Sequence, residues 1–274
     1  MDQALIDYLK EQKKHKYTFE NCDKKQLVHS LLSEIGHQDP EIRDGLIYSN
    51  LAHLLHDNHF SKDELIDFTS ILLDDAHLFY DIGNEKPLSV LTRSFSILQL
   101  VIIVYVHRRD SLFTNDQLMN LYHRFLDYFK KETVLNGYDN EYGFMHSIAH
   151  AADLFSQLVQ LEEINESHLK EMFQVIGEKY KTRDYFFSHD EDERMVVAIK
   201  KGLERKVLSL DFLIGWVEQF SIYEKDVRYP EMYFITNNVK LFLRSLYFAL
   251  LDHDDFTELV SKIKQVLKEN VSLR

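Results

Sequence analysis

Residues 61–74 read SKDELIDFTSILLD, and patterns of this kind decide the fold class of the chain. The apolar side chains from Leu65 to Leu72 recur at the three- and four-residue spacing that places them on one face of a helix. Ser61 precedes this face and Glu64 follows three residues later, which is the pattern of a capping box. The hydroxyl accepts a hydrogen bond from a free amide of the first turn, and the carboxylate reaches back. The stretch therefore predicts an amphipathic helix that begins next to Ser61.

The same two signals recur along most of the chain. Residues 114–117 and 255–258 also resemble capping boxes, and no stretch of alternating apolar and polar residues is long enough to predict a convincing strand. Only 8 glycines and 3 prolines occur in 274 residues, whereas turn-rich folds use many of both. The sequence therefore predicts an all-α protein of about twelve helices. Their expected bounds are 2–14, 24–35, 40–57, 61–74, 88–109, 115–131, 144–159, 166–180, 191–205, 209–220, 230–251 and 255–271.

Short connections between the expected helices favour neighbours that pack as antiparallel pairs. The pairs recur at intervals of about 40 residues, which is typical of a HEAT- or armadillo-like α-α superhelix built from stacked pairs. No stretch rich in Ser and Gly divides the chain, so we expect residues 1–274 to form a single all-helical domain. The weakest joint is 181–192, where acidic residues cluster and helical periodicity lapses.

Composition narrows the function classes. The formal net charge of −13 argues against nucleic acid binding, which depends on Lys and Arg side chains that neutralise phosphates. Cys22 is the only cysteine, so the chain can form neither an internal disulfide nor a cysteine zinc cluster. The N-terminal residues lack the pattern of a signal peptide, and the most apolar run, Leu98–Val106, is shorter than the ~20 residues that span a bilayer. We therefore expect a cytoplasmic protein that binds no membrane.

Residues 136–153, NGYDNEYGFMHSIAHAAD, form the one segment whose composition suggests a specific role. Two of the eight glycines flank a short polar loop that includes Tyr138, and the loop leads into an expected helix. That helix carries His146, His150 and Asp153. Spacings of four and three residues place these side chains on one helical face. Two imidazoles there can chelate a divalent metal with the carboxylate as third ligand, or the trio can transfer protons.

A structural interpretation of this trio is favoured over a catalytic one. Ala149, Ala151 and Ala152 indicate tight helix packing, and histidines on such helices commonly fix geometry through hydrogen bonds. His146 and His150 also lack the glutamate between them that the HExxH zinc motif requires. No metal is therefore expected, and the trio is a weak candidate for one. Acid–base or ligand-binding chemistry ranks second.

Charged or amide side chains on otherwise apolar helices form a second group of candidates. Arg43 with Asp44, and Arg93, each stand at the beginning of such a helix. Each arginine is either solvated or paired with an acid on a neighbouring helix. If these helix starts converge, they form a polar groove at one edge of the stack. Asn238 and Arg244 on the long penultimate helix pose the same question.

Several histidines fit a simpler interpretation. His53 and His56 lie near the expected end of one helix, and His77 follows Asp74 just after another. The helix dipole favours cations at such ends. We therefore interpret these histidines as helix-end or turn residues.

Three pieces of the chain resemble an uncharacterised bacterial family called domain of unknown function 2785. They are DPEIRDGLIY at 39–48, RSFS at 93–96 and, most specifically, GYDNEYGFMHSIAHAAD at 137–153. Shorter similarities lie at 193–194 and 238–246, so the resemblance spans roughly residues 30–250. It implies a helical-repeat fold and a bacterial source, but no activity.

Two positions depart from the pattern of that family. It usually has Trp where this chain has Phe144, and Gly where this chain has Ala151. The first change keeps an aromatic wedge, whereas the second adds a methyl group that would narrow a pocket. The resemblance singles out Arg43, Asp44, Arg93, His146, His150 and Asp153.

The sequence contains no glycine-rich nucleotide loop, no GxSxG and no HExxH, so no cofactor is expected and no enzyme class is indicated. A non-catalytic scaffold that binds a protein, a peptide or another ligand is the favoured function, because stacked helix pairs present extended surfaces. The alternative is an enzyme or small-ligand binder that uses the His146, His150 and Asp153 face for metal- or base-assisted hydrolysis. A nucleic-acid-binding repeat ranks third because of the acidic charge.

Overall fold

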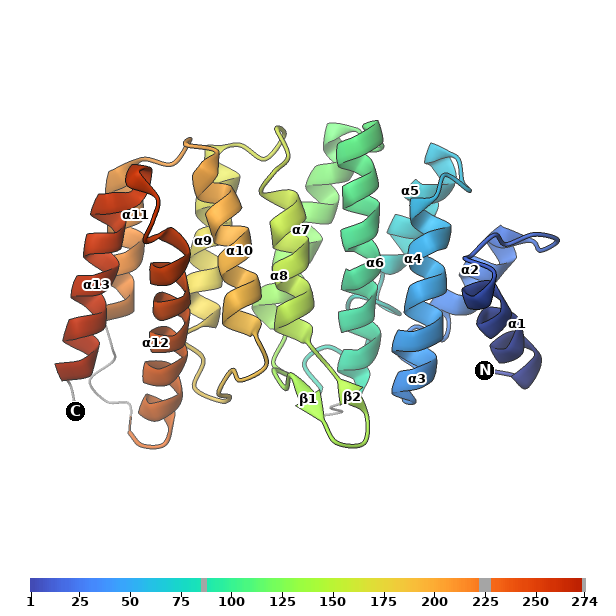
Figure 1. The fold of residues 1–274 in the computed structure, drawn as a ribbon, viewed down its shortest axis with the longest axis horizontal. Helices are drawn as coiled ribbons and strands as arrows, with labels where there is room; N and C mark the ends of the chain where they lie inside the picture. The colour runs from blue at the N-terminus through green and yellow to red at the C-terminus, as the bar shows by residue number, and fades with distance from the viewer. Residues whose placement is uncertain (85–87, 222–227, 273–274) are drawn as a thin grey trace. The chain divides into compact units, whose positions relative to one another are not determined.

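The computed structural model describes residues 1–84, 88–221 and 228–272. The chain divides into two compact units, Met1–Leu154 (unit 1) and Phe155–Arg274 (unit 2). The boundary falls inside helix α8, Ser147–Leu158. The elements follow one another along the chain as coloured in Figure 1.

Unit 1 consists of helices and one small β-hairpin. Its elements before α8 are α1 (Gln3–Lys14), α2 (Lys24–Leu32), α3 (Pro40–Ile42), η1 (Arg43–Tyr48), α4 (Ser49–His56), α5 (Lys62–Leu72), α6 (Ser89–Asp110), α7 (Asn115–Lys131), β1 (Tyr138–Asp139) and β2 (Gly143–Phe144). The turn η1 is π-helical, a conformation that is rare and occurs frequently at functional sites. In unit 1, α6 packs against both α4 and α5.

Among its described residues, unit 2 contains helices joined by loops and turns, and no strand. After the end of α8 it contains α9 (Glu166–Lys179), α10 (Glu191–Glu204), α11 (Leu210–Glu218), η2 (Gln219–Ser221), α12 (Glu231–Leu250), η3 (Asp254–Phe256) and α13 (Thr257–Ser272). Next-but-one helices pack together, α9 with α11, α11 with α13 and α10 with α12. Such contacts are expected of stacked helix pairs.

The all-α prediction is confirmed. Because α3, η1 and α4 run on without a break, the thirteen α-helices α1–α13 make twelve helical segments in the described part of the chain. Both partners of the predicted capping boxes at Ser61 and Thr114 make their hydrogen bonds. The third predicted start differs, because the 3-10 turn η3 precedes α13 and the helix begins at Thr257. The HEAT-like repeat and the single domain stay predictions.

Helix α6 forms much of the core of unit 1. Leu91, Ile97, Leu100 and Ile103 on it are fully buried. By length and composition α6 could span a membrane, with a mean hydropathy of 1.8 over 18 residues. However, 78% of that window is buried inside the structure, as in the core helix of a soluble protein. Burial against other helices is sufficient to account for its apolar sequence.

Candidate functional site

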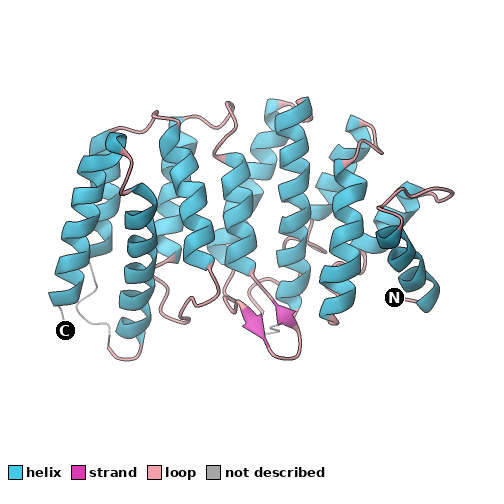
Figure 2. Cartoon of the chain, viewed as in Figure 1, coloured by secondary structure: helices cyan, strands magenta, loops and turns pink. Residues whose placement is uncertain are grey.

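A short β-hairpin in unit 1 connects α7 to α8 (Figure 2). Its strands are antiparallel, with Tyr138 opposite Phe144 and Asp139 opposite Gly143. At the tip, Asp139 Oδ1 accepts hydrogen bonds from the backbone N–H of Glu141 at 2.8 Å and of the following residue at 3.0 Å. Tyr138 and Phe144 are 42% and 47% exposed, and their rings meet edge to face with centroids 5.2 Å apart. The hairpin thus holds an aromatic pair at the surface.

The fully buried side chain of Arg43 fixes this hairpin through hydrogen bonds to its backbone. Its Nη2 donates to the backbone carbonyls of Tyr142 at 2.9 Å and Phe144 at 3.3 Å, and its Nη1 donates to that of His37 at 3.2 Å. Its Nε lies 2.8 Å from Asp44 Oδ1. Burial lowers the pKa of Arg43 and raises that of Asp44, while the charge of each partner opposes the shift of the other. Arg43 therefore ties the beginning of η1 to the hairpin.

The predicted residue His150 lies on α8 and is 5% exposed. Its Nδ1 lies 2.7 Å from Ser94 Oγ and 3.2 Å from the Ser94 carbonyl oxygen. Because the Ser94 hydroxyl donates its hydrogen to the Met145 carbonyl at 2.5 Å, it can only accept from the imidazole. The hydrogen-bond network therefore assigns the neutral His150 proton to Nδ1 and the lone pair to Nε2. The ring also meets Phe95 edge to face at 5.3 Å.

His146 does not lie on the helix, which corrects the predicted start at residue 144. The helix begins at Ser147, and His146 has φ +47°. The backbone N–H groups of Met145 and His146 both point to the Gly137 carbonyl, at 2.9 and 3.3 Å, which holds the chain in the closing turn of the hairpin. The rings of His146 and His150 nevertheless lie with centroids 5.4 Å apart. His146 is the residue just before the helix, and its carbonyl accepts the first helical hydrogen bond, from the His150 N–H at 2.8 Å.

Asp153, the third member of the predicted trio, is partly buried on α8. Among the described residues, no group of three or more His, Cys, Asp or Glu side chains is placed to hold a metal ion. The trio consequently does not form a three-ligand centre in this structure.

Arg93 and Glu132 form a buried ion pair at the beginning of α6, and each is about 1% exposed. Arg93 Nε and Nη2 donate to the two carboxylate oxygens at 2.7 and 2.8 Å. Its Nη1 donates to the Tyr80 carbonyl at 2.8 Å and to Ser89 Oγ at 2.7 Å. The sequence left open whether Arg93 is solvated or paired with an acid, and in the structure it is paired with an acid. The acid follows α7.

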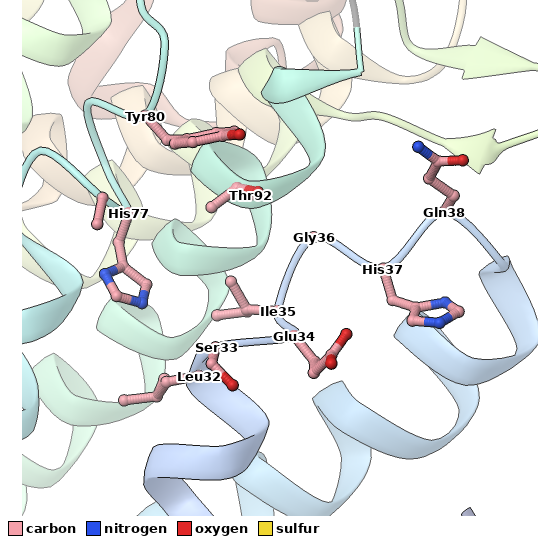
Figure 3. Close-up of a pocket in the computed structure, with 11 residues that line it drawn as sticks. Leu32, Ser33, Glu34, Ile35, Gly36, His37, Gln38, His77, Tyr80 and Thr92 are labelled. Atoms are coloured by element: carbon pink, nitrogen blue, oxygen red, sulfur yellow. The ribbon is translucent and has the colours of Figure 1, made fainter. Parts of the chain in front are cut away.

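A pocket of about 690 Å³ opens in unit 1 beside these two arginines (Figure 3). Its walls come from the end of α2 with the following loop, from the turn after α5, and from α6. The lining residues are Leu32, Ser33, Glu34, Ile35, Gly36, His37, Gln38, Ala76, His77, Tyr80 and Thr92. Sequence reasoning missed this pocket, because its three walls are far apart in the chain and carry no motif.

Hydrogen bonds determine which nitrogen of each pocket imidazole carries the proton in the neutral form. His77 Nδ1 lies 2.8 Å from Asp74 Oδ1, which also accepts a hydrogen bond from the Ala76 backbone N–H at 2.8 Å. The carboxylate therefore keeps the proton of neutral His77 on Nδ1 and the lone pair on Nε2. His37 has the opposite tautomer, because its Nδ1 accepts from the Asp39 backbone N–H at 3.1 Å. Neutral His37 consequently carries its proton on Nε2.

The buried arginines fix the walls of the pocket as well as the hairpin. Arg43 Nη1 holds the carbonyls of His37 and Gln38, and Arg93 Nη1 holds that of Tyr80. The loop approaches α6 so closely that a Cβ atom on Gly36 would lie 2.1 Å from Thr92 Oγ1. The close approach of the loop to α6 and the hydrogen bonds from the two arginines together fix the shape of the pocket before any ligand binds.

The remaining predicted candidates, Asn238 and Arg244, belong to α12 of unit 2. Buried Asn238 donates from Nδ2 to the Tyr185 carbonyl at 2.8 Å and accepts from the Phe187 N–H at 3.0 Å. It therefore fixes the 181–190 connection, which carries little helical periodicity of its own. Arg244 is exposed.

A family model described as a protein of unknown function, DUF2785, matches residues 78–248. The matched range includes the hairpin, the histidine pair and most of α12, whereas Arg43 and the pocket loop at 33–38 precede it. No curated protein and no solved structure matches the chain.

Proposed function

Because the chain belongs to the DUF2785 family of proteins of unknown function, we propose a function from its own geometry: a non-catalytic binding protein that holds a small polar molecule in the pocket of unit 1. The observation that carries this proposal is the pocket itself. Its volume of about 690 Å³ lies within the ~300–1,000 Å³ that is usual for ligand sites.

The rigidity of the walls supports binding. A site whose walls are already fixed loses little conformational entropy when a ligand enters, so more of the contact energy remains as affinity. Fully buried Arg43 and Arg93 tie two of the walls through backbone carbonyls. Arginine is suited to this role because its planar fork can bond several acceptors at once.

The occupation of the reactive side chains favours binding over catalysis. Ser94, the hydroxyl next to the His150 imidazole, donates to a backbone carbonyl and so has no hydrogen left for a base to remove in that geometry. His150 is almost completely buried. The alternative of hydrolysis at His146, His150 and Asp153 therefore has less support than ligand binding.

The test is a ligand-observed NMR screen of small polar compounds of neutral, anionic and cationic classes. Ala76 lines the pocket and is exposed, so Ala76→Trp should obstruct the cavity while it leaves the core intact. We expect compounds that bind the wild type to lose binding in this variant and to keep it in Val197→Trp, a control at an exposed position of α10. Binding that Ala76→Trp leaves unchanged, or no binding by any class, would contradict the proposal.

A further inference from the structure

We infer that the pocket of unit 1 takes a neutral carbohydrate or polyol, a ligand class defined by several hydroxyl groups on an uncharged body. This inference rests on the proposed function and specifies the chemistry of the same site. It follows from the charge of the lining, from the hydrogen-bonding state of the two imidazoles and from the aromatic wall.

The charge of the lining opposes strongly anionic ligands. None of the described residues that line the pocket is Lys or Arg, and Glu34 is the one lining carboxylate. The nearby guanidinium groups are engaged elsewhere, since Arg43 pairs with Asp44 and Arg93 with Glu132. A phosphate or carboxylate would therefore leave water without gaining a cation from the described lining residues, in a chain of net charge −13.

A cationic ligand fits no better. Glu34 would be its counter-charge, and Glu34 Oε1 already lies 3.3 Å from the nitrogen of Met1. The His37 imidazole would meet an ammonium group with its own N–H, because its Nδ1 accepts from the Asp39 backbone. Two donors that face each other repel. These contacts leave an uncharged ligand as the best match.

The imidazoles select a ligand that both donates and accepts. His37 offers an N–H at Nε2, whereas neutral His77 offers a lone pair at Nε2 because Asp74 holds its other nitrogen. A hydroxyl is the neutral group that can satisfy either partner. In Figure 3 the two rings lie at opposite sides of the labelled residues, His77 at the left and His37 at the right. The amide of Gln38 and the hydroxyl of Thr92 have the same dual character.

The remaining lining suits the carbon skeleton of a sugar. Tyr80, which lines the pocket, is 47% exposed, whereas the lining residues Leu32 and Ile35 are only 2% and 1% exposed. An aromatic face next to polar groups can cover the C–H face of a sugar ring while the hydroxyls bond to the side chains. Mixed polar and aromatic walls thus point to the same ligand class as the charges do.

The experiment compares ligands that share one body and differ in charge. Dissociation constants for the full chain are measured by NMR titration with D-glucose, D-galactose, D-ribose and maltose, and with glucose 6-phosphate and glucosamine. We expect at least one neutral sugar to bind, and the phosphate and ammonium forms of glucose to bind no more tightly than glucose. His77→Ala should weaken sugar binding about fivefold, the effect of one lost hydrogen bond.

The control is His53→Ala, since His53 also pairs its Nδ1 with an aspartate, Asp57, but does not line the pocket. It should leave the affinity unchanged, and melting curves verify that both variants fold. Tighter binding of glucose 6-phosphate or glucosamine than of any neutral sugar would overturn the inference and keep the pocket as a binding site. Sugar binding that His77→Ala leaves intact would also overturn it. If no compound of any class binds, the proposed function fails as well.

Discussion

At the scale of single residues, the arginine and asparagine side chains that the sequence singles out as candidates for a polar groove hold backbone segments in place. Arg43, Arg93 and Asn238 are buried, and each bonds to carbonyls of a connection that is remote in sequence. A buried charge is tolerated only when its partners are complete, since its loss of hydration is large. An arginine with one partner removed is therefore a sensitive test of this arrangement.

Replacement of Arg93 by methionine should strongly destabilise the protein. It removes both hydrogen bonds to Glu132 and leaves that carboxylate buried without a cation, a loss of about 3–5 kcal/mol in the free energy of unfolding. The double variant Arg93→Met/Glu132→Leu should recover part of this loss, because neither charge of the buried pair remains. Urea unfolding followed by circular dichroism measures both.

The matched control is Arg124→Met. Arg124 pairs with Asp75 at the surface, where the two side chains are 38% and 93% exposed, and also donates from Nε to the Leu73 carbonyl at 2.8 Å. Exposed pairs contribute about 0–1 kcal/mol. An Arg93→Met variant that is no less stable than Arg124→Met would show that the buried pair does not support the fold.

At the scale of elements, the sequence predicted the helix starts that depend on a local pattern of residues. It missed the features that depend on contacts with residues distant in the chain. The capping boxes at Ser61 and Thr114 indicate where their helices begin, and each is a pattern only four residues long. The hairpin, by contrast, has strands of two residues and is held by Arg43, about a hundred positions away. The pocket likewise needs three remote walls. No local periodicity encodes either feature.

Gly143 is the position at which the hairpin should be most sensitive. Its φ of +72° is unfavourable for any residue with a Cβ atom, and such an atom would lie 3.0 Å from Pro40 Cβ. We expect Gly143→Ala to lower the free energy of unfolding by about 1–3 kcal/mol. Thermal and urea unfolding measure the loss, and amide exchange of residues 138–144 should show the hairpin opening first.

Gly45→Ala in η1 provides the comparison, because nothing lies within 4 Å of its added Cβ atom and its φ is not positive. This substitution should leave the free energy of unfolding unchanged or raise it by up to about 1 kcal/mol, because alanine lowers the conformational entropy of the unfolded chain. Equal losses in both variants would mean that the close approach of Gly143 to Pro40 has no particular importance.

At the scale of the whole molecule, the continuity of α8 bears on the predicted single domain. Residues Ser147–Leu158 form one helix, although the boundary between the compact units follows Leu154. If unit 1 unfolded alone, α8 would have to end there and leave backbone groups without their helical partners. This cost should couple the unfolding of the two units, so that the chain unfolds in one transition.

The only tryptophan makes this coupling measurable. Trp216 lies in unit 2, is 3% exposed and donates from Nε1 to the Phe173 carbonyl at 2.7 Å, so its fluorescence reports the unfolding of that unit. Arg93→Met perturbs unit 1. In a coupled chain it lowers the urea midpoint of Trp216 fluorescence and of circular dichroism by the same amount. The opposite result is a fluorescence midpoint that stays at its wild-type value while the circular dichroism curve splits into two steps. The units would then be separate domains, because the helical hydrogen bonds of α8 across Leu154 would be too weak to couple their unfolding.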